Sequence, residues 1–357
     1  MQREPNWDRL TVLVVEDNSF MRLLTANTIR ALGIGEVAVA EDGAAAIKRL
    51  KAGRTDPAAA ELGIVDIVFS DYLMPVVDGK LLLRWIRTGS DTPDRFVPFV
   101  MVSGAADRDV VEQARDGGVT DFLAKPFSAQ SMADRILSVI NNPRQFVLTE
   151  GYFGPDRRRT DQPAEHERRV IDPAQIQIVH KASSKKRLRD DVKVIYFRFV
   201  NRLRDKLGVN SLKGQVDIDP AFIRAADERI HSFFGDYADW VRRSVRDMIA
   251  ARDALAAGEG KATAHIAGIG AIAHELRGQS GIFDYPLITR IAKSLYEATA
   301  DPAVAVTPSR IELIGAHIDT IRNVFADKVT GDGGDTGAAL LREMEAAVKK
   351  FNRAGGA

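Results

Sequence analysis

Three acidic side chains fall where a parallel sheet would bring them together. Glu16 and Asp17 follow the apolar run LTVLVV, and Asp71 ends the run IVDIVFSD. The carboxyl ends of parallel strands meet at one edge of a sheet, where ligands bind. One such acid alone would more often be a helix cap, but three that converge repel one another unless a cation lies among them. Hard oxygen ligands with access to solvent suit Mg²⁺.

Two further side chains point to an anion at the same edge. Ser103 ends the fourth apolar run, FVPFVMVS, and Lys125 ends the fifth, VTDFLAK. A hydroxyl and an ammonium group would together bind an anion that a Mg²⁺ ion could share. The set predicts a site for a phosphoryl group on a carboxylate, with Asp71 as the nucleophile.

The stretch HELRGQSG, residues 274–281, begins like the zinc signature H-E-x-x-H, but the second histidine is replaced by Gly278. Without two imidazoles one helical turn apart, that zinc site is excluded. On a helix, His274 lies away from the apolar stripe, on a face that it shares with Gly270, Gly278 and Gly281. Glycine in a helix costs ~1 kcal/mol relative to alanine. The glycines therefore predict close approach of another protein, and Arg277 could neutralise charge on a phosphorylated ring.

The elements that must position the first site alternate between strand and helix. Short valine-rich runs separated by helical patterns predict an α/β, doubly wound, five-stranded parallel sheet covered on both faces. The expected strands are residues 10–15, 36–40, 64–71, 96–103 and 119–125.

The second half of the chain has a different pattern. Residues 142–182 are rich in charge, proline and glycine, which predicts a flexible charged linker. At about 40 residues, such a linker would have a root-mean-square reach of roughly 35 Å. An apolar stripe at helical spacing resumes over 188–207, and the remainder reads as all helix. The expected helices are residues 219–234, 236–257, 261–283, 286–300, 306–328 and 336–351.

Composition bounds the function further. The chain has 357 residues, 45% of them hydrophobic and 28% charged, with a formal net charge of +1. This balance argues against nucleic acid or an anionic membrane as the partner. The chain has no cysteine, so thiol catalysis and disulfides are excluded. The charged N-terminal stretch is not a signal peptide and no apolar run could span a bilayer, so a cytoplasmic location is expected.

The segments VVEDN, SDYLMPVVDG, MVSGA and DFLAKPF resemble the receiver domain of two-component response regulators, a flavodoxin-like fold, over residues 10–141. The resemblance implies that Asp71 accepts a phosphoryl group from a sensor histidine kinase. Glu16, Asp17 and the backbone carbonyl of Leu73 would be ligands of Mg²⁺, together with Asp71.

The same resemblance assigns three more positions. Ser103 and Lys125 would contact the phosphoryl oxygens, and the peptide bond between Lys125 and Pro126 would be cis. The family's aromatic switch position falls on Phe122. Phenylalanine lacks the hydroxyl of a tyrosine, so the packing of the ring alone could transmit the conformational change.

The segment AHELRGQSG resembles the histidine phosphotransfer (HPt) motif, in which a histidine on a helical bundle carries phosphate between receivers. His274 would be the phosphohistidine, with Arg277 and Gly278 at the docking surface. The resemblance covers residues 215–330 loosely. The next turn, Ile282-Phe283-Asp284, departs from the family's usual glycine.

The domain organisation expected is a receiver over 1–141, a linker over 142–182 and a helical region over 183–357 that contains an HPt-like bundle at about 215–330. Such a protein is a phosphoacceptor with weak self-dephosphorylation rather than an enzyme. Its partners would be a kinase and another receiver, and a homo-oligomer is compatible with the sequence. Three alternatives are a DNA-binding regulator, a scaffold or output module with a vestigial site, and a hydrolase that uses His274. A basic recognition helix and a nucleophile or metal partner for His274 are both missing from the sequence.

Overall fold

The computed structural model describes residues 4–55, 64–104, 108–156, 176–179, 193–197, 200–209, 214–301 and 305–354. These residues divide into two compact units, Met1–Ala124 with Ser128–Ile230, and Lys125–Phe127 with His231–Ala357.

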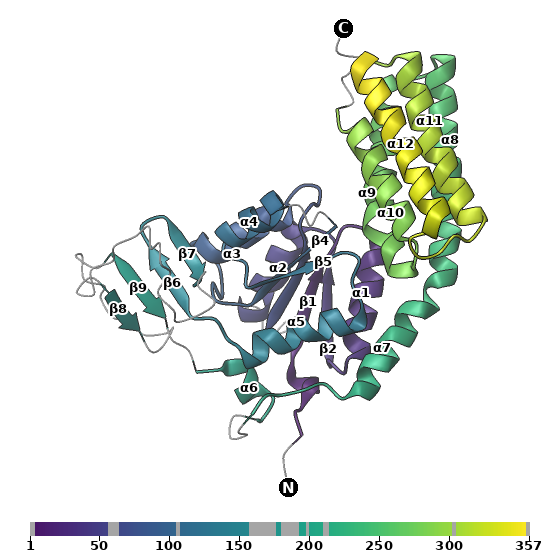
Figure 1. The fold of residues 1–357 in the computed structure, drawn as a ribbon. Helices are drawn as coiled ribbons and strands as arrows, with labels where there is room; N and C mark the ends of the chain where they lie inside the picture. The colour runs from purple at the N-terminus through teal and green to yellow at the C-terminus, as the bar shows by residue number, and fades with distance from the viewer. Residues whose placement is uncertain are drawn as a thin grey trace. The chain divides into compact units, whose positions relative to one another are not determined.

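The first unit is built on a five-stranded sheet in the order β2-β1-β3-β4-β5, in which every neighbouring pair is parallel. This confirms the predicted doubly wound sheet, and Figure 1 shows helices on both of its faces. The strands are β1 (Thr11–Val15), β2 (Glu36–Ala40), β3 (Ile67–Asp71), β4 (Phe99–Ser103) and β5 (Asp121–Ala124). The helices are α1 (Ser19–Ala31), α2 (Gly43–Thr55), α3 (Gly79–Thr88), α4 (Arg108–Asp116) and α5 (Ala129–Asn141).

The sheet forms because its central strands are apolar on both faces. Every residue of β1, β3 and β4 is buried, as expected for parallel strands covered by helices on both sides. The side chain of Asn18 caps α1 by accepting a hydrogen bond from the backbone of Met21 at 2.9 Å. The strand order reverses between β1 and β3, and at such a switch point the loops after the two strands diverge to leave a crevice.

A second sheet follows where the sequence predicted a flexible linker. Four short strands in the order β7-β6-β9-β8 occupy parts of residues 146–197. Their bounds are β6 (Phe146–Thr149), β7 (Tyr152–Pro155), β8 (Ile176–Val179) and β9 (Val194–Phe197). The linker prediction is therefore wrong for 146–155 and 176–179, and the estimated reach of the segment no longer applies. Residues 157–175 and 180–182 of the predicted linker lie outside the described residues.

Aromatic side chains join this second sheet to the rest of the first unit. Phe96, which precedes β4, packs edge-on against Phe146 of β6 and Phe153 of β7, with ring centroids 5.3 and 5.2 Å away. Phe197 of β9 completes the group at 5.4 Å from Phe96. Such pairs stabilise by ~0.5–1.5 kcal/mol beyond the area that they bury. The strands thus extend the core of the first unit.

Arg87, in the last turn of α3, lies under this aromatic group and is 1% exposed. Its guanidinium donates to the carbonyls of Gly118, Arg95 and Val97 at 2.8–3.0 Å, and it lies 5.1 Å from the ring centroid of Phe146. Burial lowers the pKa of Arg87 to about 10. The residue remains protonated at neutral pH, so its charge is buried against carbonyl oxygens and an aromatic face.

The predicted helical stripe over 188–207 was also wrong in part. Residues 194–197 form strand β9, and the short helix α6 (Arg202–Lys206) follows. Residues 188–192 and 198–199 of the predicted stripe lie outside the described residues. The run VIYFRFV is short, β-branched and aromatic, and periodicity alone cannot separate a helix from a strand in such a run.

The segment after α6 returns to the start of the chain. The backbone of Asn6 donates to the carbonyl of Leu207 at 3.1 Å. Lys206 pairs at 2.5 Å with Asp66, a buried carboxylate that also accepts from the backbone of Thr11 at 2.9 Å. Residues 201–209 therefore pack beside the starts of the central strands β1 and β3.

The helical half begins with α7 (Pro220–Ser232) and continues through five more long helices. Their bounds are α8 (Phe234–Ala257), α9 (Ala262–Gln279), α10 (Pro286–Thr299), α11 (Pro308–Ala326) and α12 (Gly334–Ala354). These match the predicted helices closely, with α9 tightening into a 3₁₀ turn over Ser280–Phe283. Helices α8 to α11 pack each against the next, and α11 returns to α8, which closes a four-helix ring. Among the described helices, none is long and apolar enough to cross a membrane.

Candidate functional site

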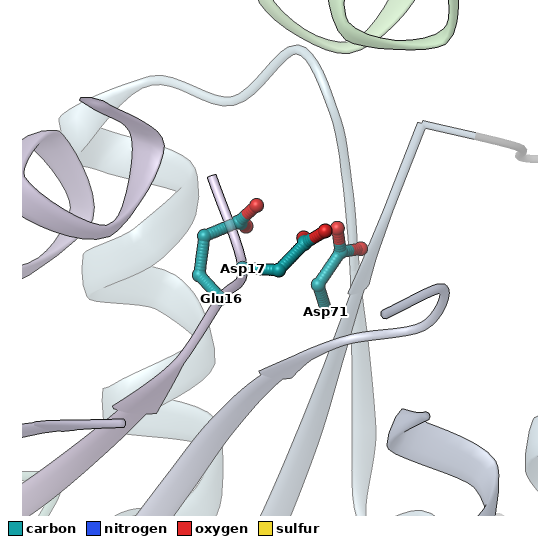
Figure 2. A group of neighbouring side chains, drawn as sticks. All are labelled: Glu16, Asp17 and Asp71. Carbon is teal, nitrogen blue, oxygen red and sulfur yellow. The ribbon is translucent and has the colours of Figure 1, made fainter. Parts of the chain in front are cut away.

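The predicted acidic site forms at the carboxyl edge of the first sheet. Ligand oxygens of Glu16, Asp17 and Asp71 all lie within 4.8 Å of one another, and Figure 2 shows the three side chains converging. Glu16 and Asp71 are buried, whereas Asp17 is exposed. Three carboxylates this close repel one another, so a cation among them would be strongly favoured. Hard oxygen donors, one of them open to solvent, fit Mg²⁺, which keeps part of its water shell.

The backbone around the acids is fixed by local hydrogen bonds. The backbone of Glu16 donates to the carbonyl of Ala40 at 3.1 Å, which ties the end of β1 to β2. Arg22 of α1 donates to the carbonyl of Glu16 at 2.6 Å and to that of Asp17 at 3.0 Å. Sequence reasoning missed Arg22, although its place one turn into the helix after the acids is a signal that could have found it.

Asp71 is held at the end of β3 by its own neighbours. Its Oδ1 accepts a hydrogen bond from the backbone of Tyr72 at 2.7 Å. Gly79 starts α3 so close that a Cβ there would overlap the carbonyl oxygen of Asp71, which explains the glycine. In the loop between them, Val76 has φ of +65°, a strained conformation for a β-branched residue. Such strain clusters at functional sites.

The other residues predicted for this site follow the neighbouring strands or lie beside them. Ser103 ends β4 and pairs in register with Ala124 of β5, so Lys125 directly follows that neighbour. The peptide bond between Lys125 and Pro126 is cis, as expected. Phe122 is half-buried against the core of the first unit. Leu73 is 41% exposed, two residues after Asp71. The roles assigned to these four residues stay predictions.

His274 belongs to the second unit, where it is half-buried on α9. Its Nδ1 lies 3.1 Å from Nη2 of Arg277, and its ring centroid lies 5.3 Å from that of Tyr296 on α10. Arg277 also lies over Tyr296, 5.0 Å from the ring centroid. Sequence reasoning found the histidine and the arginine but missed Tyr296, which comes from another helix.

The glycine face predicted around His274 is not a single exposed surface. Gly270 is buried, and a Cβ there would lie 2.9 Å from Oγ1 of Thr299 on α10. The prediction that Gly270 belongs to a docking surface is therefore wrong, because this glycine permits close packing inside the bundle. Gly278 is half-buried further along α9, and Gly281 lies in the following 3₁₀ turn.

Ser280, within the stretch HELRGQSG, has a structural role in the bundle. It is fully buried, and its hydroxyl accepts a hydrogen bond from the hydroxyl of Tyr237 on α8 at 2.8 Å. Tyr237 stacks on Phe283 with ring centroids 4.3 Å apart. This contact ties the C-terminal end of α9 to α8.

Comparisons with known proteins cover the first unit. Residues 12–137 match the model of the response regulator receiver domain. The chain is 33% identical to the chemotaxis protein CheY of Pseudomonas aeruginosa over 127 residues, which are 36% of this chain and 93% of that protein. It is 31% identical to chemotaxis protein CheY-3 of Vibrio cholerae, again over 36% of this chain and 88% of that protein.

Among solved structures, the chain resembles the receiver domain of a sensor histidine kinase from Pseudomonas aeruginosa with a magnesium ion coordinated in the active site cleft. The identity is 29%, the TM-score is 0.30, and the match covers 36% of this chain and 94% of that one. The parallel sheet, the acidic cluster at its switch point and the matched relatives agree: residues 12–137 form a two-component receiver domain like that of CheY, and the chain belongs to the response regulator receiver family.

Proposed function

We propose that the chain is a phosphorelay protein with two phosphoryl stations, Asp71 in the receiver and His274 in the helical bundle. The observation that carries the first station is the convergence of Glu16, Asp17 and Asp71 within 4.8 Å at the carboxyl edge of the sheet. A sensor histidine kinase would supply the phosphoryl group.

In the receiver, Glu16, Asp17, Asp71 and the carbonyl of Leu73 would hold Mg²⁺. The ion would offset the negative charge that builds up on the transferring phosphoryl group. A carboxylate oxygen of Asp71 would attack the phosphorus of the kinase's phosphohistidine, and the N–P bond would break with its electron pair on the imidazole nitrogen. Ser103 and Lys125 would orient the phosphoryl oxygens. Phe122 would transmit the change by repacking against the core.

For the second station, the support is the setting of His274. It lies half-buried on one helix of a closed four-helix ring, with a cationic side chain one turn away. An imidazole presented this way can attack an aspartyl phosphate, and a nearby guanidinium favours the charge that results. Phosphate would then pass between His274 and a receiver, either that of the same chain or a separate one.

The test is direct labelling of the full chain with radioactive phosphoramidate, a small phosphoryl donor, in the presence of Mg²⁺. We expect wild type to carry two labels, an acyl phosphate cleaved by hydroxylamine and a base-stable, acid-labile phosphohistidine. Asp71→Asn should lose only the first label and His274→Gln only the second.

The matched control for His274 is His265→Gln, on the same helix, which should keep both labels. Hydroxylamine-sensitive label that persists in Asp71→Asn would refute the receiver assignment. Base-stable label that persists in His274→Gln would refute the second station and leave the helical half as a scaffold or output module.

A further inference from the structure

The contact between Arg277 and His274 determines which imidazole nitrogen carries the proton. Nη2 of Arg277 lies 3.1 Å from Nδ1 of His274. A guanidinium has only donors and stays protonated at any ordinary pH. Nδ1 must therefore present its lone pair, and the proton of the neutral ring lies on Nε2.

Tyr296 of α10 supports both groups from one side. The imidazole and the guanidinium lie 5.3 and 5.0 Å from its ring centroid. A guanidinium over an aromatic face gains cation–π stabilisation in addition to the hydrogen bond. Among the described residues, Nε of Arg277 is buried and makes no hydrogen bond. His274 and Tyr296 therefore both hold the guanidinium in this pose.

We propose that Arg277 is a positioning residue that keeps the proton off Nδ1 of His274 and thereby prolongs the lifetime of a phosphoryl group on Nε2. The proposal rests on the proposed function of His274. The unloaded ring with hydrogen on Nε2 and the loaded ring with phosphorus on Nε2 share one property, a lone pair on Nδ1. Arg277 can donate to that lone pair in both forms, so it stabilises the resting and the loaded states alike.

Unloading needs the opposite form of the ring. The bond between Nε2 and phosphorus breaks, its electron pair goes to Nε2, and a new bond forms from phosphorus to a carboxylate or water oxygen. With a proton on Nδ1, the leaving group is neutral imidazole; without it, the leaving group is the far more basic imidazolate. Arg277 must leave Nδ1 before a proton can bind there, and only then does fast transfer follow.

Loading runs through the same step in reverse. The ring proton moves from Nε2 to Nδ1 through solvent once Arg277 has released Nδ1. Nε2 then attacks phosphorus, and the bond from phosphorus to the donor breaks with its electron pair on the donor. Nδ1 loses its proton to water, and Arg277 returns. One side chain thus separates a stable loaded state from a reactive one.

The test uses the full chain carrying Asp71→Asn, so that only His274 takes the base-stable label. Nitrogen-15 NMR of the unloaded ring reports the tautomer. We expect Nε2–H for the background protein, and a shift of population toward Nδ1–H in Arg277→Met. After loading with phosphoramidate, the half-life of the phosphohistidine at neutral pH should shorten about tenfold in Arg277→Met, the scale of one charge-assisted hydrogen bond.

Three further variants sharpen the result. Arg342→Met, at an exposed arginine of α12, should change neither readout. Arg277→Lys restores a donor and should recover part of the half-life. Tyr296→Leu, which removes the supporting ring, should shift the tautomer in the same direction as Arg277→Met and provides a second route if that variant folds poorly.

An unchanged tautomer together with an unchanged or longer half-life in Arg277→Met would overturn the proposal. Absence of base-stable label on the background protein would instead remove the proposed function of His274, and the lifetime effect with it. In that case the tautomer measurement would still decide whether Arg277 controls the ring.

Discussion

At the scale of single residues, the acidic site was predictable because parallel strands present their ends at one edge. Glu16, Asp17 and Asp71 come together as the pattern predicted. The supporting contacts were less visible. Arg22 acts through backbone carbonyls, and Tyr296 reaches His274 from a different helix. Contacts between distant elements depend on packing, which spacing along one helix does not encode.

Removal of one acidic ligand should weaken metal binding in the absence of any phosphoryl donor. We expect Asp17→Asn to lower the affinity for Mg²⁺ at least about tenfold, the effect of ~1.4 kcal/mol. Titration of Mg²⁺ into the full chain, followed by NMR shifts of residues near β1 and β3, measures this. Asp134→Asn, an exposed acid on α5, is the matched control. Equal affinity in wild type and Asp17→Asn would contradict the assignment of this residue as a ligand.

His317 should make the bundle sensitive to acid. It is fully buried; its Nδ1 lies 2.7 Å from the carbonyl of Leu313, and its Nε2 lies 2.8 Å from the hydroxyl of Ser294. Burial lowers the pKa of His317 below 6.5, its ordinary value. The unfolded chain then binds more protons than the folded one, so stability is full above pH 6.5 and falls as pH drops below it.

The measurement is hydrogen exchange of α10 and α11 amides in the full chain between pH 7.5 and 5. Exchange must be corrected for its intrinsic dependence on pH. We expect opening to become easier toward pH 5 in wild type and less so in His317→Gln, which cannot titrate. Parallel profiles for the two proteins would show that His317 is not the group responsible.

At the scale of elements, two groups were predictable from sequence. The helices of the second half have long amphipathic patterns, and the strands of the receiver are short runs made almost entirely of apolar residues. The second sheet was not. Its strands have four residues each and pair across long stretches of charged sequence. Local composition there favours a disordered segment. The strands pack instead through aromatic side chains that are distant in the sequence, such as Phe96 against Phe146.

Two glycines of α9 should respond differently to the same substitution. Gly268→Ala meets nothing within 4 Å and should stabilise the bundle by up to ~1 kcal/mol through helix propensity. Gly270→Ala would place its Cβ 2.9 Å from Oγ1 of Thr299, which already donates to the carbonyl of Leu295 at 2.9 Å. We expect it to be less stable than Gly268→Ala by ~1–3 kcal/mol because of overpacking. Urea unfolding followed by helical signal compares the pair, and equal gains from both would show that Thr299 can move aside.

At the scale of the whole molecule, the receiver unit is larger than its family match. The match ends at residue 137, yet the compact unit continues through Ile230. A fragment ending at residue 141 would uncover Arg87, whose charge is covered by Phe146. We therefore expect a fragment of residues 1–141 to be several kcal/mol less stable than one of residues 1–230.

Phe146→Ala in the full chain tests the same point without truncation. Loss of a large buried aromatic side chain costs ~3–5 kcal/mol. The chain has two more tryptophans, Trp7 and Trp240, so each protein also carries Trp7→Phe and Trp240→Phe. Urea unfolding monitored by the fluorescence of Trp85, a residue of α3, then reports the receiver. Thr149→Ala, in the half-exposed part of β6, is the control and should change little. A receiver as stable in Phe146→Ala as in wild type would show that the second sheet is only an appendage.

The return of residues 201–209 to the N-terminal segment has a consequence for synthesis on the ribosome. The ion pair of Asp66 with Lys206 and the backbone hydrogen bond of Asn6 with Leu207 cannot form until residues 206 and 207 have been translated. At ~5–20 residues per second, the 72 residues that separate position 137 from position 209 take roughly 4–14 s to translate. During that interval the nascent first unit has its acidic cluster but lacks β6 to β9 and the contacts of residues 201–209. Newly made chains therefore need several seconds before this unit can reach its final stability.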